Sequence, residues 1–305
     1  MIAFNKNSKI KPGTNLIMLP EGATQTFSLA EAAVKNEQMG KDEVTDMLCV
    51  SISSTDAVGH QYGTRGKENQ DVYMRSDKEL AAFLTALDEQ VGKDNYLVVM
   101  TADHGGAHNP NLLKKHKIPA GGWDGKGAMK TANEELAKQF GVQGNLIKDM
   151  LNNFFYLDRE LIEANKLSWD DVKAAAIKEL KKDPEAQYVV DMEHIATSNM
   201  PEFLRERALN AYFPGRTGEI MVITHPQVFT WRFGDDYIGT THGAWNPYDA
   251  HIPLLFMGWK IGHGNTYQPT KIVDMAATVC ALLNIQMPNA CIGTAILPVL
   301  ESTKK

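Results

Sequence analysis

The sequence predicts an α/β protein with a parallel sheet. Residues 96–101 (Tyr-Leu-Val-Val-Met-Thr) form a short, apolar and β-branched run, the pattern of a strand that is buried on both faces. A second strand-like run covers residues 46–53, and the intervening segment 69–91 has apolar residues at helical spacing. Strand, helix and strand in this order form one βαβ unit, which predicts a parallel pair with a right-handed crossover.

The other elements follow from capping and breaker residues. Ser28 and Glu31 form a capping-box pattern, which predicts a helix over residues 29–39. The elements expected downstream are a strand at 153–157, a helix at 169–182 with Ser168 as its cap, strands at 187–193, 218–224 and 252–257, and a helix at 270–283. The chain becomes richer in charge after Gly106. We therefore expect residues 107–217 to form a small inserted α/β lobe, and residues 1–106 and 218–305 to form the core domain.

Composition restricts the class of protein. The chain has 305 residues, of which 43% are hydrophobic and 22% charged, as in globular proteins. Its net charge of −6 argues against a nucleic-acid polymer as partner. We see no apolar run of the roughly 20 residues that a membrane span needs. Residues 1–12 also lack the apolar core of a signal peptide.

Carboxylates and imidazoles gather where strands are expected to end. Asp56 and His60 have a D-x-x-x-H spacing in a polar turn, with Gly59, that is expected after the first strand. Asp103 and His104 follow the second strand, and His242 precedes a third. Neighbouring strands lie about 4.8 Å apart, so these groups are expected to converge. Such ligands suit zinc, although manganese and iron accept the same ligand types.

Each of these residues also has a structural explanation. Asp103 alone suits a helix N-cap, and His104 alone suits a partly buried hydrogen-bonding group. Asp56 and His60 alone are only an Asp and a His four residues apart. Their joint occurrence at three predicted strand ends, each beside a glycine, favours a metal site.

Three motifs that contain these residues occur in order along the chain: Ser53-Ser54-Thr55-Asp56-x-x-Gly59-His60, Thr101-Ala102-Asp103-His104-Gly105, and Thr241-His242-Gly243 with Tyr248-Asp249-x-His251-Ile252-Pro253-Leu254-Leu255-Phe256. Together they resemble the alkaline phosphatase superfamily. Within it they are most similar to the type I phosphodiesterase/nucleotide pyrophosphatase family, including phosphate-irrepressible bacterial alkaline phosphatases. The resemblance implies a three-layer, mostly parallel sheet with helices on both faces. It also implies zinc-dependent hydrolysis of small phosphate esters by a periplasmic or secreted parent protein.

The resemblance assigns the ligands to two zinc sites. Asp56, His60 and His242 would hold one zinc ion, and Asp103 and His104 the second. In the family an upstream Asp completes the second site, and a nearby Thr or Ser is the nucleophile. Neither has a match here, so we expect a chain that begins partway through the family domain, with no nucleophile, an incomplete second site and impaired activity.

Two alternatives share these ligands. A metal-dependent phosphomutase of the same superfamily has the same metal-binding residues, and a non-catalytic remnant would bind metal or phosphate ester without turnover. We discount sulfatases, whose C/S-x-P-x-R nucleophile motif is not found in this chain.

Overall fold

The computed structural model describes residues 16–303, and the chain forms two compact units. One contains the chain up to Gln61, together with Arg65–Asp103 and the segment from Ile252 onward. The other contains Tyr62–Thr64 and His104–His251. The expectation that residues 1–12 carry no signal peptide lies outside the described residues.

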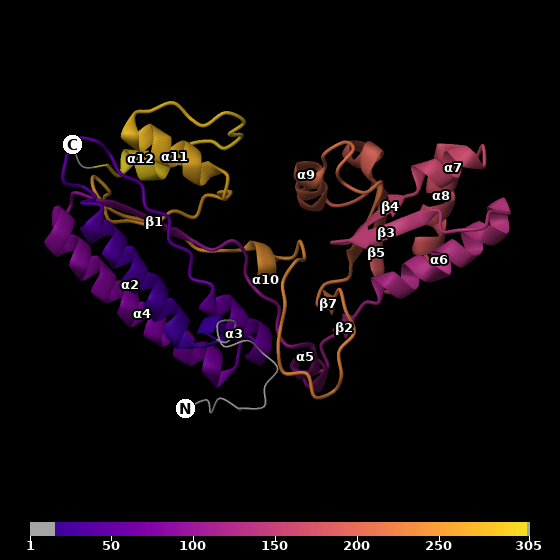
Figure 1. Cartoon of the computed structure of the whole chain (residues 1–305), viewed down its shortest axis with the longest axis horizontal. Helices are drawn as coiled ribbons and strands as arrows, with labels where there is room; N and C mark the ends of the chain where they lie inside the picture. The colour runs from indigo at the N-terminus through magenta and orange to yellow at the C-terminus, as the bar shows by residue number, and fades with distance from the viewer. Residues whose placement is uncertain (1–15, 304–305) are drawn as a thin grey trace. The chain divides into compact units, whose positions relative to one another are not determined.

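The first unit is built around an antiparallel strand pair. β1 (Leu97–Thr101) pairs with β8 (Leu254–Gly258), with Val99 opposite Phe256. Figure 1 shows α2 and α4 on one side of this pair and α11 and α12 on the other. The helical elements of this unit are η1 (Leu16–Met18), α2 (Pro20–Asn36), α3 (Ser54–Tyr62), α4 (Lys67–Leu87), η2 (Asp88–Gly92), α11 (Asp274–Leu283) and α12 (Leu297–Glu301).

Most predicted elements of this unit are confirmed, but one strand is wrong. The predictions at 96–101, 69–91, 252–257 and 270–283 correspond to β1, α4, β8 and α11, and the helix predicted at 29–39 begins earlier, at Pro20. Residues 46–53 form no strand, and Met47 is 83% exposed. The predicted parallel pair is therefore wrong as well, because the partner of β1 is the antiparallel β8. A strand needs a neighbour for its backbone groups, and an apolar run alone does not supply one.

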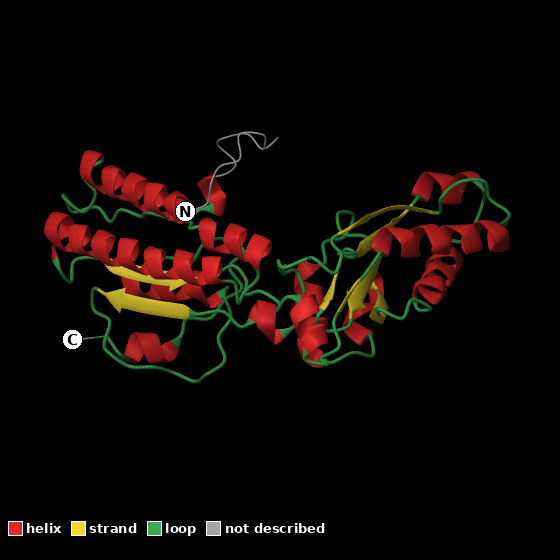
Figure 2. Ribbon diagram, turned by 90° about the horizontal axis from the view of Figure 1, so that it is seen from below, coloured by secondary structure: helices red, strands yellow, loops and turns green. Residues whose placement is uncertain are grey.

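The second unit contains a four-stranded antiparallel sheet in the order β3-β4-β6-β5, with helices packed against it (Figure 2). A short parallel pair joins β2 to β7. The strands of this unit are β2 (Gly121–Gly122), β3 (Ile147–Leu151), β4 (Phe154–Leu157), β5 (Ala186–Asp191), β6 (Ile220–Thr224) and β7 (Val228–Phe229). The helical elements are α5 (Pro110–Lys115), α6 (Gly125–Phe140), α7 (Arg159–Ala164), α8 (Trp169–Leu180), η3 (Met192–Thr197), α9 (Glu202–Ala211) and α10 (Pro247–Ala250).

Strand β6 is the centre of the hydrophobic core of this unit. Ile220 and Val222 join the cluster beneath α6 and α8, whereas Met221 and Ile223 join the cluster with η3 and α9. Every residue of β6 is buried, as the sequence predicts for 218–224. Since β6 lies beyond residue 217, this sheet continues past the expected end of the inserted lobe, and our division into domains stays a prediction.

The capping residues were reliable guides in this unit. The helix predicted at 169–182 is α8, and the Ser168 side chain accepts a hydrogen bond from the Asp171 amide. The strands predicted at 153–157 and 187–193 are β4 and β5. The mixture of helices and sheet agrees with the predicted α/β class. Across residues 16–303, we find no helix with both the length and the apolar character for crossing a bilayer.

Candidate metal centre

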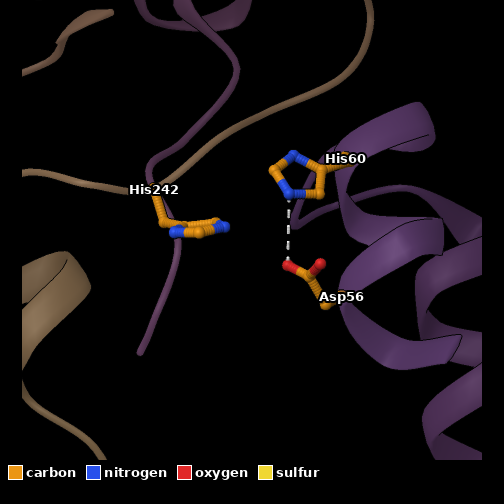
Figure 3. Close-up of side chains that lie close together, drawn as sticks. All are labelled: Asp56, His60 and His242. Carbon is orange, nitrogen blue, oxygen red and sulfur yellow. Dashed lines mark ion pairs between the residues drawn. The ribbon is translucent and has the colours of Figure 1, made fainter. Parts of the chain in front are cut away.

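Asp56 and His60 lie on successive turns of α3 and face one another (Figure 3). Asp56 Oδ1 and His60 Nε2 are 3.4 Å apart, and both side chains remain partly accessible to solvent. The sequence predicts a polar turn at these residues, and the structure corrects this to a helix. The helix is what makes the D-x-x-x-H spacing useful, because residues four apart share one face. One carboxylate and one imidazole are thereby held close enough to bind the same ion.

His104 and His242 come together in the second unit. Their imidazole rings stack with centroids 3.4 Å apart and an angle of 12° between the planes. The two residues are 138 positions apart in the sequence, and no helix or strand carries either of them. Backbone hydrogen bonds join their segments, since the Ala107 amide donates to the Thr241 carbonyl over 3.0 Å. The structure therefore brings these two candidate ligands together within this unit.

The ring of His104 is oriented by its neighbour in the chain. Nδ1 lies 2.7 Å from the Gly105 carbonyl oxygen. A carbonyl only accepts hydrogen bonds, so this contact assigns the proton to Nδ1. The Nε2 lone pair is then the one that suits a metal ion.

Asp103 follows the end of β1 and belongs to the first unit, whereas His104, the next residue, belongs to the second. The Thr101 hydroxyl, at the end of β1, donates to the Pro253 carbonyl over 2.8 Å. This contact holds the end of β1 against the segment that enters β8. Asp103 lies just past a strand, as predicted. The predicted burial of that strand on both faces is wrong, because four residues of β1 are half-buried and Met100 is exposed.

Sequence reasoning gave no role to Asp249, although its motif was part of the resemblance. Asp249 is only 4% exposed, and its Oδ2 accepts a hydrogen bond of 2.7 Å from the Ala244 amide. Burial raises the pKa of this carboxyl group, while the Ala244 and Gly243 amides and the electrostatic interaction with His104 oppose that rise. The sequence feature that could have pointed to Asp249 is its position seven residues after the candidate ligand His242, in a segment that leads into an apolar strand.

The donor atoms suit a divalent metal ion of the zinc type. They comprise the carboxylates of Asp56 and Asp103 and the imidazoles of His60, His104 and His242, which are the oxygen and nitrogen ligands that zinc accepts. Two features of the structure fit such an ion. The Asp56–His60 pair is preformed on a helix face, and the Gly105 carbonyl holds the proton of His104 on Nδ1.

Comparisons with known proteins identify the relatives of this chain. The model of the type I phosphodiesterase/nucleotide pyrophosphatase family matches residues 15–245. A protein from Myroides odoratus named calcium-transporting ATPase is 45% identical over 284 residues, covering 92% of this chain and 51% of that protein. Alkaline phosphatase PafA from Elizabethkingia meningoseptica is 41% identical over 287 residues, covering 92% and 50% respectively. The chain thus spans about half the length of these relatives.

Solved structures give the same assignment of fold. The crystal structure of wild-type alkaline phosphatase PafA matches with a TM-score of 0.87 and 41% identity, over 93% of this chain and 53% of that one. Murine ectonucleotide pyrophosphatase/phosphodiesterase 5 matches with a TM-score of 0.55 and 15% identity, over 82% of this chain and 56% of that one. At that identity the second match concerns the fold alone. The predicted alkaline-phosphatase-like fold is therefore confirmed.

Proposed function

Because this chain belongs to the type I phosphodiesterase/nucleotide pyrophosphatase family, we propose that it takes part in the hydrolysis of small phosphate esters at a metal centre. Asp56, His60 and His242 would hold one divalent ion, for which zinc is the proposed identity. Asp103 and His104 would bind a second. The relatives of this chain include alkaline phosphatases, so its resemblance to hydrolases is plain. The reaction that this chain itself catalyses is what we propose.

One observation carries the proposal: the stacked rings of His104 and His242. His242 is assigned to the first ion and His104 to the second. Rings 3.4 Å apart keep one ligand of each ion adjacent, as a two-metal site requires.

The chain enters the second unit within two residues of His60. Thr64 follows His60 by four residues and belongs to the second unit, where its hydroxyl donates to the Ala107 carbonyl over 3.5 Å. The Thr240 hydroxyl donates to the same carbonyl, two residues before His242. This shared carbonyl therefore connects the segment that follows His60 to the segment that carries His242.

The chemistry of such a site is mainly electrostatic. When bound, the divalent ions supply positive charge for the oxygens of a phosphoryl group in transfer. Residues of this chain would bind the ions. The Asp56 and Asp103 carboxylates provide negative charge, and the Gly105 carbonyl keeps the proton of His104 on Nδ1. The upstream nucleophile and third ligand of the second site have no match in the sequence. We therefore propose tight binding of one ion, weaker binding of a second, and impaired turnover by this chain alone.

The test begins with metal-free protein titrated with zinc in competition with a chromogenic chelator. We expect one zinc ion to bind tightly and a second weakly. His242→Ala should weaken the tight site by at least about tenfold, because that site loses one of three protein ligands. His194→Ala is the matched control, since His194 is an exposed histidine in η3 that bonds to Asp191. If excess zinc does not bind to the wild-type chain, the proposal fails.

Hydrolysis of p-nitrophenyl phosphate then separates an enzyme from a binding protein. Zinc-dependent turnover that disappears in His242→Ala supports the hydrolase. Zinc binding without turnover supports the non-catalytic alternative. We also propose that the parent protein is exported to the periplasm or the medium, which cell fractionation tests.

A further inference from the structure

The short helix α10 binds the backbone next to His104. The Gly105 amide donates to the Asp249 carbonyl over 2.6 Å, and the Gly106 amide donates to the Tyr248 carbonyl over 2.9 Å. Two consecutive hydrogen bonds fix the direction of the backbone that leaves His104. The orientation of this ring therefore depends on where α10 lies.

The side chain of Asp249 binds the backbone next to His242. Its Oδ2 accepts the Ala244 amide at 2.7 Å, two residues after His242. Gly243 lies between His242 and Ala244 and has a positive φ of 109°, a conformation that glycine adopts readily. The hydrogen bond from Ala244 to Asp249 holds the turn in this conformation. A carboxylate is a stronger acceptor for an amide than a neutral group, so this hydrogen bond is well suited to hold the turn.

One residue thus ties both histidine segments together. Asp249 uses its carbonyl for the segment of His104 and its carboxylate for the segment of His242. Burying a carboxylate is costly, and Oδ1 of Asp249 is buried with no hydrogen-bond partner in the described structure. An apolar residue would fill this space without that cost, which indicates a role beyond packing.

We propose that Asp249 is a positioning residue that sets His104 against His242, and thereby sets the spacing of the metal ligands they provide. This inference rests on the proposed metal centre. It adds that the ligand geometry is fixed by a carboxylate that binds backbone amides and coordinates no ion.

The experiment compares substitutions of Asp249 in the full chain with a matched control. Asp249→Ala removes the acceptor, Asp249→Asn keeps an oxygen for the Ala244 amide, and Asp249→Glu keeps the charge but displaces it by one methylene. Asp158→Ala is the control, because Asp158 also accepts one backbone amide, that of Leu161 at 2.9 Å, at the start of α7. Each variant is first checked for cooperative thermal unfolding.

Two measurements are made on each variant. The first is the imidazole carbon and proton NMR shifts of His104 and His242 in metal-free protein, assigned by substituting each histidine. Stacked rings shift one another, so a lost stack moves both signals toward those of free histidine. The second is zinc affinity, for which losing a group that orients a ligand costs about 10- to 100-fold.

We expect Asp249→Ala and Asp249→Glu to lose the stacking shifts and to weaken zinc binding, while Asp249→Asn and Asp158→Ala stay near the wild type. The proposal is overturned if folded Asp249→Ala keeps both properties, or if Asp249→Asn loses them as completely as Asp249→Glu does. If Asp249→Ala does not fold, the contrast between the Asn and Glu variants decides. A wild-type chain that binds no zinc would refute the metal centre, whereas the metal-free NMR shifts would still decide the positioning role.

Discussion

Gly105 lies where two backbone segments approach one another closely in the second unit. A Cβ atom at this position would sit 2.2 Å from the Tyr248 carbonyl oxygen, far inside contact distance. At Gly106 the nearest atom to such a Cβ would be the Thr64 methyl carbon, at 3.4 Å. Two adjacent glycines therefore have different reasons to be present, and only the first is required by the close approach of α10.

This difference gives a prediction for a pair of single substitutions. Gly105→Ala should lower the free energy of unfolding by about 1–3 kcal/mol, because backbone atoms have to move apart. It should also weaken zinc binding, because the moving segment carries His104. Gly106→Ala should change both properties much less. Urea unfolding and zinc competition measure the two effects, and equal losses in both variants would contradict the explanation.

At this scale the sequence points to candidate ligands more readily than to the residues that would support them. Asp103 and His104 were singled out because two ligand types adjoin each other after an apolar run, and in the structure His104 stacks on His242. Asp249 was overlooked because its partners are backbone amides, which leave no trace in side-chain spacing. Supporting groups of this kind become visible only once the backbone path is known.

Helix α6 is joined to strand β3 by one buried side chain. The Asn133 amide group donates to the Ile147 carbonyl over 2.9 Å and accepts from the Ile147 amide over 2.8 Å. It thereby completes the hydrogen bonding of a fully buried strand residue from a neighbouring helix. In the sheet Ile147 lies opposite Leu157 of β4, so the hydrogen bonds of Asn133 tie α6 to this strand pair.

Removing that side chain should be costly. We expect Asn133→Ala to lower the free energy of unfolding by about 2–4 kcal/mol, since two buried backbone groups lose their partner. Asn165→Ala is the control, because Asn165 is exposed and makes one hydrogen bond within its own helix end. Chemical denaturation of both variants measures the difference. A loss below about 0.5 kcal/mol in Asn133→Ala would show that water replaces the side chain without cost.

Local signals determined which elements the sequence predicted correctly. Ser168 caps α8 through its own hydroxyl, so that helix was predictable from neighbouring residues alone. The run at 46–53 was misread because a strand depends on a partner elsewhere in the chain. Helix α3 was taken for a turn because polar residues and Gly59 obscure its periodicity.

Strand β6 of the second unit and strand β8 of the first unit differ in how deeply they are buried. Every residue of β6 is buried, whereas the residues of β8 alternate between half-buried and exposed. Opening a segment costs more when it is deeply buried. The division of the core domain from an inserted lobe at residues 107–217 is not settled by this contrast and stays a prediction.

Hydrogen exchange should reveal the contrast directly. We expect amides of β6 to exchange at the rate set by global unfolding, and amides of β8 to exchange much faster through local opening. Mass spectrometry of peptides spanning 220–224 and 254–258, in chelator so that no metal contributes, measures both. Equal protection of the two strands would contradict the expectation.

The β1–β8 pair has a practical consequence. Within the described chain each strand has a single neighbour, and Met100 and Leu255, which lie opposite one another, are 41% and 49% exposed. Outer strand edges of this kind have unpaired backbone groups, with which a strand of another polypeptide can form hydrogen bonds. Crowded preparations of the isolated chain will therefore tend toward aggregates that grow edge to edge, and dilution is the simplest protection.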